Sequence, residues 1–197
     1  MIKSAIFLLM SFTMLILSSC NGSTDSEGKE HKKFKSSSQS STPIDLTTKE
    51  SPEEIRFYNL TKNLQAQYEA AKFSEAKSDI SGIMDLLPHY EDNWNYGNAV
   101  HKINIVAGRI ALQEGELEEA KKYLILAGKT KGSPQLNSFG PNMTLAKELL
   151  EKGEREVVLQ YFDLCSVFWK SEFRDINEWR EIVLKGGIPN FGANLKF

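Results

Sequence analysis

Residues 101–134 read HKINIVAGRIALQEGELEEAKKYLILAGKTKGSP, which are two helical segments separated by a turn and closed by a proline. Gly108 lies inside the first segment, where a glycine costs about 1 kcal/mol relative to alanine, so we expect another helix to approach closely there. Gly115 supplies the turn, and Pro134 closes the unit. Aliphatic and small side chains share one face of the second segment: Leu117, Ala120, Leu124 and Ala127. The spacing predicts two helices packed side by side.

This unit resembles a tetratricopeptide repeat. Small, turn, small and aliphatic residues follow one another in it at the intervals of that repeat. The resemblance implies a hairpin of two helices that packs against similar hairpins on either side.

The flanking segments carry the same pattern less completely. Before the central unit, Leu64 stands where the repeat has a small residue, and Ala71 replaces the turn glycine. The intervals from Phe73 to Leu117 and from Leu117 to Arg155 are 44 and 38 residues, whereas a strict repeat keeps about 34. The matching positions on either side are Phe73, Ala76, Ile80, Ile83 and Pro88, and then Ala146, Leu149, Gly153, Val158 and Phe162.

The whole region from Ser51 to Phe197 is predicted to be all-α, because its apolar residues recur with a helical period and not with the alternation of a strand. We expect a short α-solenoid of about three degenerate tetratricopeptide-like helical hairpins plus a C-terminal capping helix, since about three repeats are needed for stability. A generic antiparallel helical bundle is the alternative.

Capping signals and breakers place the expected helices. Ser51, Pro52 and Glu54 combine an N-cap, a proline at the first helical position and a capping-box glutamate. The connector Gln135 to Gly140 is expected to be a loop, and the tail Ile188 to Phe197 an extended strip on the last helices. The predicted helices are Ser51–Tyr68, Phe73–Leu87, one from between Asp92 and Asn98 to Gln113, Glu116–Lys129, Pro141–Lys152, Glu154–Lys170 and Asp175–Gly186.

Two further strings support this fold. Residues 132–143, GSPQLNSFGPNM, and residues 187–195, GIPNFGANL, resemble those of an uncharacterised bacterial family with tetratricopeptide-like helices. The similarity covers roughly Asn98 to Phe197. It implies the fold and no activity.

The N-terminus has the three parts of an export signal. Lys3 is followed by an apolar run from Ala5 to Leu17, and Leu17-Ser18-Ser19-Cys20 ends it. This start resembles a bacterial lipoprotein signal with its lipobox, which implies cleavage of residues 1–19 and lipid attachment to Cys20. The alternatives are an ordinary signal peptide and a membrane-spanning helix. A span needs about 20 apolar residues, and this run has thirteen.

Lipidation would place the protein in the cell envelope, anchored to a membrane through Cys20. Asn21 follows that cysteine, which favours the periplasmic face of the outer membrane if the cell is Gram-negative. Residues 20–50 are predicted to be a flexible tether, because their serine-rich, lysine-flanked composition cannot bury enough apolar surface to offset its ordering entropy. Residues 51–197 are long enough to form one domain with its own core.

Charge and cysteine content exclude several classes of function. The formal net charge is −2, so no strong basic field is available to hold nucleic acid. If Cys20 carries lipid, Cys165 has no partner in the mature chain and no internal disulfide is possible. Cys165 lies in an apolar helix and is expected to be a small core residue.

No catalytic, metal or cofactor site is predicted. His89 and His101 are the only histidines of the domain, and no further ligands follow at zinc spacing. The sequence has no glycine-rich phosphate loop and no nucleophile-elbow serine. We therefore expect a protein that is not an enzyme.

The predicted working surface is the groove lined by the first helices of the pairs, which in tetratricopeptide proteins holds an extended peptide or a partner helix. Its cations and tyrosines suit an acidic peptide or a free carboxylate. The connector Gln135 to Gly140, with Phe139, is a second candidate contact. Carried over from the resemblance, the peptide-binding residues are Tyr58, Gln65, Tyr68, Lys102, Arg109 and Lys147.

The sequence thus favours a non-enzymatic, lipid-anchored module that binds another envelope protein or peptide. Two alternatives remain open. One is an envelope enzyme or enzyme subunit with its site in the connector loops. The other is a neutralising, immunity-type lipoprotein that binds one toxin or hydrolase.

Overall fold

The computed structural model of the protein describes residues 50–170 and 176–196, which are helical and contain no strand. This confirms the all-α prediction. The chain divides into Met1–Leu46 and Thr47–Phe197, and every described residue belongs to the second unit. The predicted signal peptide, the lipidated Cys20 and nearly all of the predicted tether lie outside the described residues. None of the described helices is both long and apolar enough to cross a bilayer.

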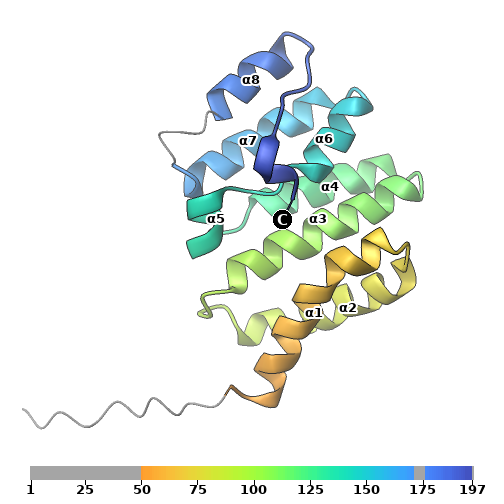
Figure 1. Ribbon diagram of the computed structural model, residues 1–197, viewed down its shortest axis with the longest axis vertical. Helices are drawn as coiled ribbons and strands as arrows, with labels where there is room; N and C mark the ends of the chain where they lie inside the picture. The colour runs from red at the N-terminus through yellow and green to blue at the C-terminus, as the bar shows by residue number, and fades with distance from the viewer. Residues whose placement is uncertain (1–49, 171–175, 197) are drawn as a thin grey trace, which may run out of the picture. The chain divides into compact units, whose positions relative to one another are not determined.

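Most predicted helices are present with ends shifted by one or two residues (Figure 1). A short 3-10 helix, η1, follows α2 and contains Pro88. Another, η2, lies in the tail. The elements are α1 (Pro52–Glu69), α2 (Phe73–Leu86), η1 (Leu87–His89), α3 (Tyr96–Gln113), α4 (Leu117–Gly128), α5 (Pro134–Phe139), α6 (Thr144–Glu151), α7 (Arg155–Phe168), α8 (Ile176–Leu184) and η2 (Gly192–Leu195).

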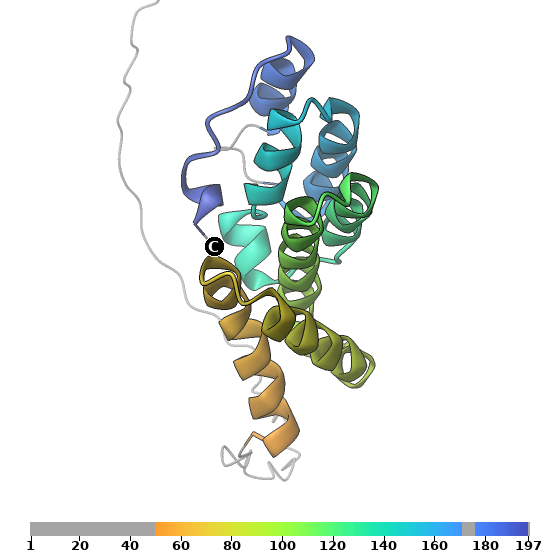
Figure 2. The ribbon, with the colours of Figure 1, turned by 90° about the vertical axis from the view of Figure 1, so that its right-hand side faces the viewer.

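Helix α3 holds the central position in the domain. It packs along α4, and it also contacts α1 and α2 on one side and α6 on the other (Figures 1 and 2). A Cβ placed on Gly108 would lie 2.3 Å from Leu145 Cδ2 and 3.0 Å from Tyr123 Cβ. The glycine therefore permits a close approach of α3 to both α4 and α6, as the sequence predicted. Gly115 has a φ of 84° in the turn, a conformation that glycine adopts without strain.

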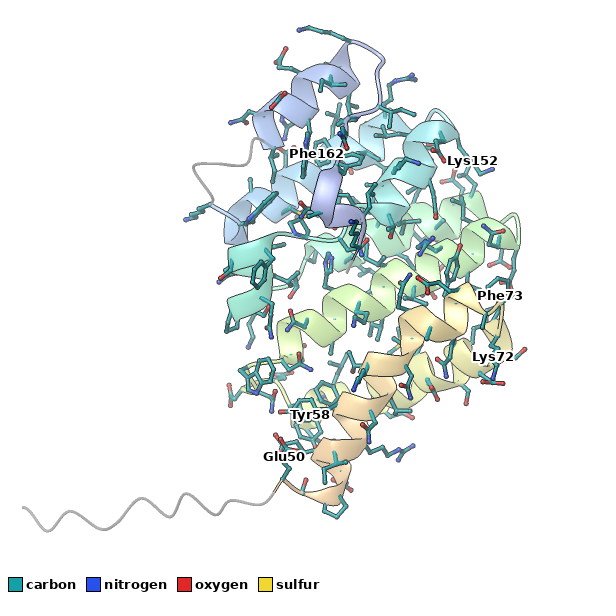
Figure 3. The ribbon with its side chains drawn as sticks, in the orientation of Figure 1. Glu50, Tyr58, Lys72, Phe73, Lys152 and Phe162 are labelled. Carbon is teal, nitrogen blue, oxygen red and sulfur yellow. The ribbon has the colours of Figure 1, made fainter. Side chains whose placement is uncertain are left out.

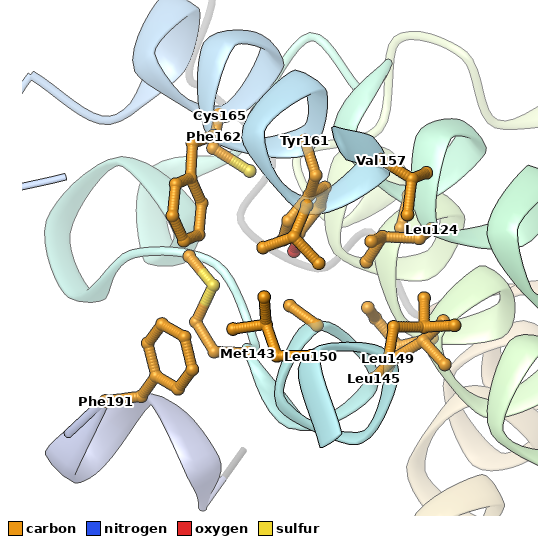
Figure 4. Packing of buried hydrophobic residues seen from close by; sticks show 14 of the residues in the cluster. Leu124, Met143, Leu145, Leu149, Leu150, Val157, Tyr161, Phe162, Cys165 and Phe191 are labelled. Carbon is orange, nitrogen blue, oxygen red and sulfur yellow. The ribbon is translucent and has the colours of Figure 1, made fainter. Parts of the chain in front are cut away.

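Two apolar clusters form the core. The smaller one joins α1, α2 and α3 around Phe57, Leu64 and Ile103. The larger one joins α4, α6, α7 and α8, and Figure 4 shows Phe162 and Tyr161 of α7 facing Met143 and Leu150 across its centre. Because α3 contributes to both clusters, it links the two halves of the domain.

Cys165 of α7 is completely buried in the larger cluster, which confirms its prediction as a core residue (Figure 4). Burial raises the pKa of its thiol, so the reactive thiolate is disfavoured. We expect a Cys20→Ser chain to react with a disulfide reagent such as DTNB only after unfolding in urea. Rapid labelling of the native Cys20→Ser chain would contradict this packing.

The connector after α4 differs from the prediction, because residues 134–139 form the short helix α5 and not a loop. Ser133 caps it by accepting a hydrogen bond from Leu136 N at 3.0 Å, and Pro134 occupies the first helical position. This is the same Ser-Pro start that begins α1, where Ser51 Oγ accepts from Glu54 N at 3.1 Å.

The predicted start of α6 at Pro141 is also wrong, because the helix begins at Thr144. The Asn142 side chain provides the N-terminal hydrogen bonds, accepting from Thr144 N at 2.8 Å and from Thr144 Oγ1 at 2.6 Å. Met143 is the N-cap residue, and its N–H, which has no acceptor within the helix, donates to Asn194 O at 2.8 Å in the tail.

The C-terminal tail packs on the last helices, as predicted, but it is not extended throughout, because Gly192–Leu195 form η2. The tail also contacts the connector. Phe191 is buried with its ring edge-on to Trp179 at 4.9 Å between centroids. Asn194 is completely buried, and its Nδ2 donates to Phe139 O at 3.1 Å and to Pro141 O at 2.9 Å. The tail thereby fixes the segment between α5 and α6. Phe197 and the predicted cap Asp175 lie outside the described residues.

Candidate functional site

A cavity of about 520 Å³ lies between α1, α3 and the segment from α5 to Asn142. Helix α1 contributes Tyr58, which Figure 3 labels on that helix. Its size is in the usual range for pockets that hold small ligands, about 300–1,000 Å³. The cavity is lined by Tyr58, Thr61, Lys62, Gln65, Asn95, Asn98, His101, Lys102, Ile105, Val106, Gln135, Leu136, Phe139, Gly140 and Asn142.

The charges in this lining are all positive. Among the lining residues that the structure describes, Lys62 on α1 and Lys102 on α3 are the only charged ones, and none is an aspartate or glutamate. Within the described part of the chain, neither lysine takes part in an ion pair or a hydrogen bond. Lys102 is half-buried, and this burial lowers the pKa of its ammonium group. Among the described residues, these two ammonium groups therefore have no carboxylate as a counter-ion.

Tyr58 is held in place at one end of the cavity. Its hydroxyl donates to Glu54 Oε1 at 2.9 Å and accepts from Asn93 Nδ2 at 3.0 Å. The ring of Trp94, which is 55% exposed, lies against Tyr58 with centroids 6.1 Å apart. Burial is the main reason that the pKa of Tyr58 is raised, so the phenol stays protonated at neutral pH. Tyr58 is thus fixed at the cavity by two hydrogen bonds, and Trp94 lies beside it outside the lining.

His101 forms part of the wall and connects three elements. Its Nδ1 lies 3.1 Å from Ala127 O of α4, and its Nε2 lies 3.0 Å from Asn142 N. Because a carbonyl can only accept and a backbone N–H can only donate, the ring is neutral with its proton on Nδ1. Its burial lowers the pKa of the imidazole to about 4. His101 therefore connects these elements structurally, and it does not take up a second proton at neutral pH.

Amides form the opposite wall. Asn98 at the start of α3 donates through Nδ2 to Gln135 Oε1 of α5 at 2.6 Å and to Asn95 Oδ1 at 2.9 Å. Its Oδ1 accepts from Ser133 Oγ at 2.5 Å. This network fixes α5 against α3, and it gives the cavity both hydrogen-bond donors and acceptors without negative charge.

The structure separates the six predicted peptide-binding residues. Tyr58, Gln65 and Lys102 line the cavity. Tyr68, Arg109 and Lys147 do not line it.

Each of the three excluded residues has a partner elsewhere. Arg109 Nη2 lies 2.7 Å from Glu148 Oε1 of α6, and its guanidinium stacks 4.0 Å from the centre of the Tyr68 ring. Lys147 pairs with Glu151 one turn later at 2.8 Å. The charge of Arg109, which was predicted to serve a ligand, is used inside the fold.

The connector and the groove, which the sequence treated as separate candidates, meet in this cavity. Phe139 lines it while remaining 60% exposed. Sequence reasoning missed Lys62 and the asparagines at 95 and 98, although Lys62 lies one helical turn after Tyr58 and shares its face. The helix-start signal of Ser133 and Pro134 could have predicted a short helix, α5, that ends at Phe139 and places it at the cavity.

Among residues 50–170 and 176–196, no group of three or more histidine, cysteine, aspartate or glutamate side chains is placed to hold a metal ion. In comparisons with known proteins, no family model, no curated protein and no solved structure matches the chain. The cavity itself is therefore the evidence from which a function is argued.

Proposed function

We propose that the protein is a non-enzymatic binding module of the cell envelope, and that its cavity holds a short segment of another envelope protein. The observation that carries this proposal is the positive charge of Lys62 and Lys102, which has no ion-pair partner among the described residues and lies beside amides and apolar side chains in one cavity. Such a combination of a few placed polar groups and an apolar wall is typical of ligand pockets. No cofactor or metal is required for this function.

The proposal includes a tetratricopeptide-like arrangement. In it, α1–α2, α3–α4 and α6–α7 are the three hairpins, and α8 caps the last one. Support comes from the packing of each helix of a pair on its partner and from the close approach at Gly108. The cavity lies against α1 and α3, the first helices of their pairs, which is the face that such repeats use for peptides. Here α5 closes that face, so a short segment fits better than a helix.

We further propose that the module is a lipoprotein. The support is the N-terminal sequence alone, with its apolar run and Cys20. Lipid on Cys20 would anchor the chain, and residues 20–50 would let the domain reach its partner. In a Gram-negative cell the expected place is the periplasmic face of the outer membrane.

The test is site-specific crosslinking in intact envelopes of the source cell. A photoreactive phenylalanine analogue replaces Phe139, which is exposed at the cavity. The wild-type background is compared with Lys62→Gln/Lys102→Gln. We expect one crosslinked protein in the first, and at least a tenfold smaller yield in the second, because each lost charge-assisted contact weakens binding by about tenfold or more.

The matched control is Lys129→Gln/Lys152→Gln, which removes the same charge from exposed positions outside the cavity. This pair should crosslink like the wild type. Lys102 and Lys62 are chosen in place of Arg109, because loss of Arg109 would leave Glu148 unpaired and disturb the fold. Equal yields with and without the two cavity lysines would overturn the proposed function.

A further inference from the structure

We propose that the protein binds a neutral saccharide unit between the Tyr58 end of the cavity and its amide wall. Three residues of this site line the cavity, and Trp94 lies beside Tyr58 outside the lining. A glycan ligand goes beyond the proposed function, since the two cavity lysines have no part in holding it. The site, which we call the aromatic–amide edge, consists of Tyr58, Trp94, Asn95 and Gln135.

The indole of Trp94 is the aromatic part of this edge. Trp94 is 55% exposed, whereas the other two tryptophans of the chain, Trp169 and Trp179, are buried. Its Nε1 donates no hydrogen bond to any described residue. The flat face of an aromatic ring carries partial negative charge and attracts polarised C–H groups, which a pyranose ring presents on its apolar face. Trp94 therefore offers a platform on which a sugar ring can stack.

Hydrogen bonds within the amide wall leave two NH₂ groups for a ligand. Asn98 Nδ2 donates to Asn95 Oδ1 at 2.9 Å and to Gln135 Oε1 at 2.6 Å, so it uses the oxygen of each neighbour. Among the described residues, neither Asn95 Nδ2 nor Gln135 Nε2 has a hydrogen-bond acceptor. Because both residues line the cavity, these NH₂ groups are donors for ligand oxygens.

The orientation of these amides is determined by the backbone of α5. Leu136 N can only donate, and it donates to Ser133 Oγ at 3.0 Å. Ser133 Oγ in turn donates to Asn98 Oδ1 at 2.5 Å, a distance that is usual for O–H···O and short for N–H···O. The oxygen of Asn98 therefore faces Ser133, and its NH₂ group faces the oxygens of the two neighbouring amides.

The loop that carries Trp94 and Asn95 is also fixed. Asn93 Nδ2 donates to Tyr58 Oη at 3.0 Å, and Asn93 Oδ1 accepts from Asn95 N at 2.8 Å. Gly97 O accepts from Thr130 Oγ1 at 3.2 Å behind this loop. An edge that is ordered before binding loses little conformational entropy when a ligand arrives.

Donors and acceptors occur together at this edge, as hydroxyl groups require. Glu54 Oε1 accepts from Tyr58 Oη and from Asn93 Nδ2, whereas Glu54 Oε2 accepts no hydrogen bond from a described residue. Sugar hydroxyls can donate to such an oxygen and accept from the NH₂ of Asn95. An anion here would meet the charge of Glu54, and a purely apolar ligand would leave the donors without acceptors. A neutral ring with hydroxyls at its rim and one apolar face satisfies all of these groups.

The experiment is a fluorescence titration of the full chain with four neutral tetrasaccharides: chitotetraose, cellotetraose, maltotetraose and mannotetraose. Because Trp94 is the exposed tryptophan, a sugar that covers it should shift the emission to shorter wavelength and reduce quenching by acrylamide. We expect saturable binding of at least one tetrasaccharide. Binding of chitotetraose alone identifies an acetamido sugar, and binding of any of the other three identifies recognition through hydroxyls; both support the proposal.

Variants connect binding to the aromatic–amide edge, and calorimetry measures them because Trp94→Ala lacks the fluorescent reporter. Trp94→Ala and Asn95→Ala should each weaken binding by about tenfold or more. The matched control is Leu184→Ala, which truncates a 60% exposed apolar side chain outside the cavity and should bind like the wild type. Lys62→Gln/Lys102→Gln should also bind like the wild type, and added salt should not change the affinity.

Three results would overturn the saccharide site. They are no saturable binding of any tetrasaccharide at millimolar concentration, equal binding by Trp94→Ala and Leu184→Ala, and loss of binding in the double lysine variant. The proposed function is decided separately by the crosslinking yield, which depends on the two lysines. Failure of one proposal therefore leaves the other to its own experiment.

Discussion

Replacing Gly97 by alanine is expected to destabilise the domain by about 3 kcal/mol, whereas the same change at Gly82 should stabilise it by about 0.5–1 kcal/mol. Both glycines lie within helices, α3 and α2. A Cβ at Gly97 would lie 1.9 Å from the backbone oxygen of Gly132, so the connector must move to admit it. A Cβ at Gly82 would meet only ordinary contacts, with Leu60 Cδ1 at 3.4 Å.

Gly108→Ala should fall between these two, with a net loss of about 1–2 kcal/mol. Its new methyl group would press on the end of the Leu145 side chain, which can shift more easily than a backbone, although Tyr123 Cβ is also close. The measurement is the free energy of unfolding in urea of the three variants and the wild type, monitored by circular dichroism. If Gly82→Ala destabilised the domain as much as Gly97→Ala, close approach would not explain these glycines.

The central hairpin was predictable because its signals are local. One unit contains all of them: Gly108, Gly115 and the apolar face of α4. Each of these signals indicates the structure of the residues next to it. The helix ends at Ser51 and Pro52 were predictable for the same reason. Residues 134–139 were missed although Ser133 and Pro134 carry the same signal, because so short a segment lacks the apolar period that marks a longer helix.

The site was only half predictable because charge pairing is a tertiary property. Lys102 and Arg109 are seven residues apart and lie on one side of α3, so the sequence treated them alike. The structure places Glu148 of α6 beside Arg109, whereas no carboxylate of the described residues pairs with Lys102. That difference depends on a side chain 39 residues away in the chain. Spacing along a single helix contains no information about it.

Acidification is expected to weaken the domain through His101. Burial lowers the pKa of this imidazole in the folded state to about 4, whereas an unfolded histidine titrates near 6.5. The unfolded state therefore binds the proton more readily, so the stability contributed by neutral His101 is complete above pH 6.5 and is lost as the pH falls towards 4. Between pH 7.5 and 5 the expected loss is about 2 kcal/mol.

The physical cause is that the His101 ring cannot take a second proton without losing one of its hydrogen bonds. Nδ1 already donates to Ala127 O, and Nε2 accepts from Asn142 N. Protonation of Nε2 would place two donors against each other in a buried site, next to the positive charge of Lys102. The ring also lies nearly parallel to that of Tyr161 of α7, with centroids 6.4 Å apart.

Urea unfolding at a series of pH values measures this effect when wild type is compared with His101→Gln and His89→Gln. The amide of glutamine does not titrate, so His101→Gln should be less stable at pH 7.5 but should lose about 2 kcal/mol less than the wild type on going to pH 5. His89 is exposed in η1, and its replacement should leave the wild-type pH dependence intact. If the free energy of unfolding changed equally with pH in His101→Gln and wild type, protonation of His101 would not be the cause of the acid destabilisation.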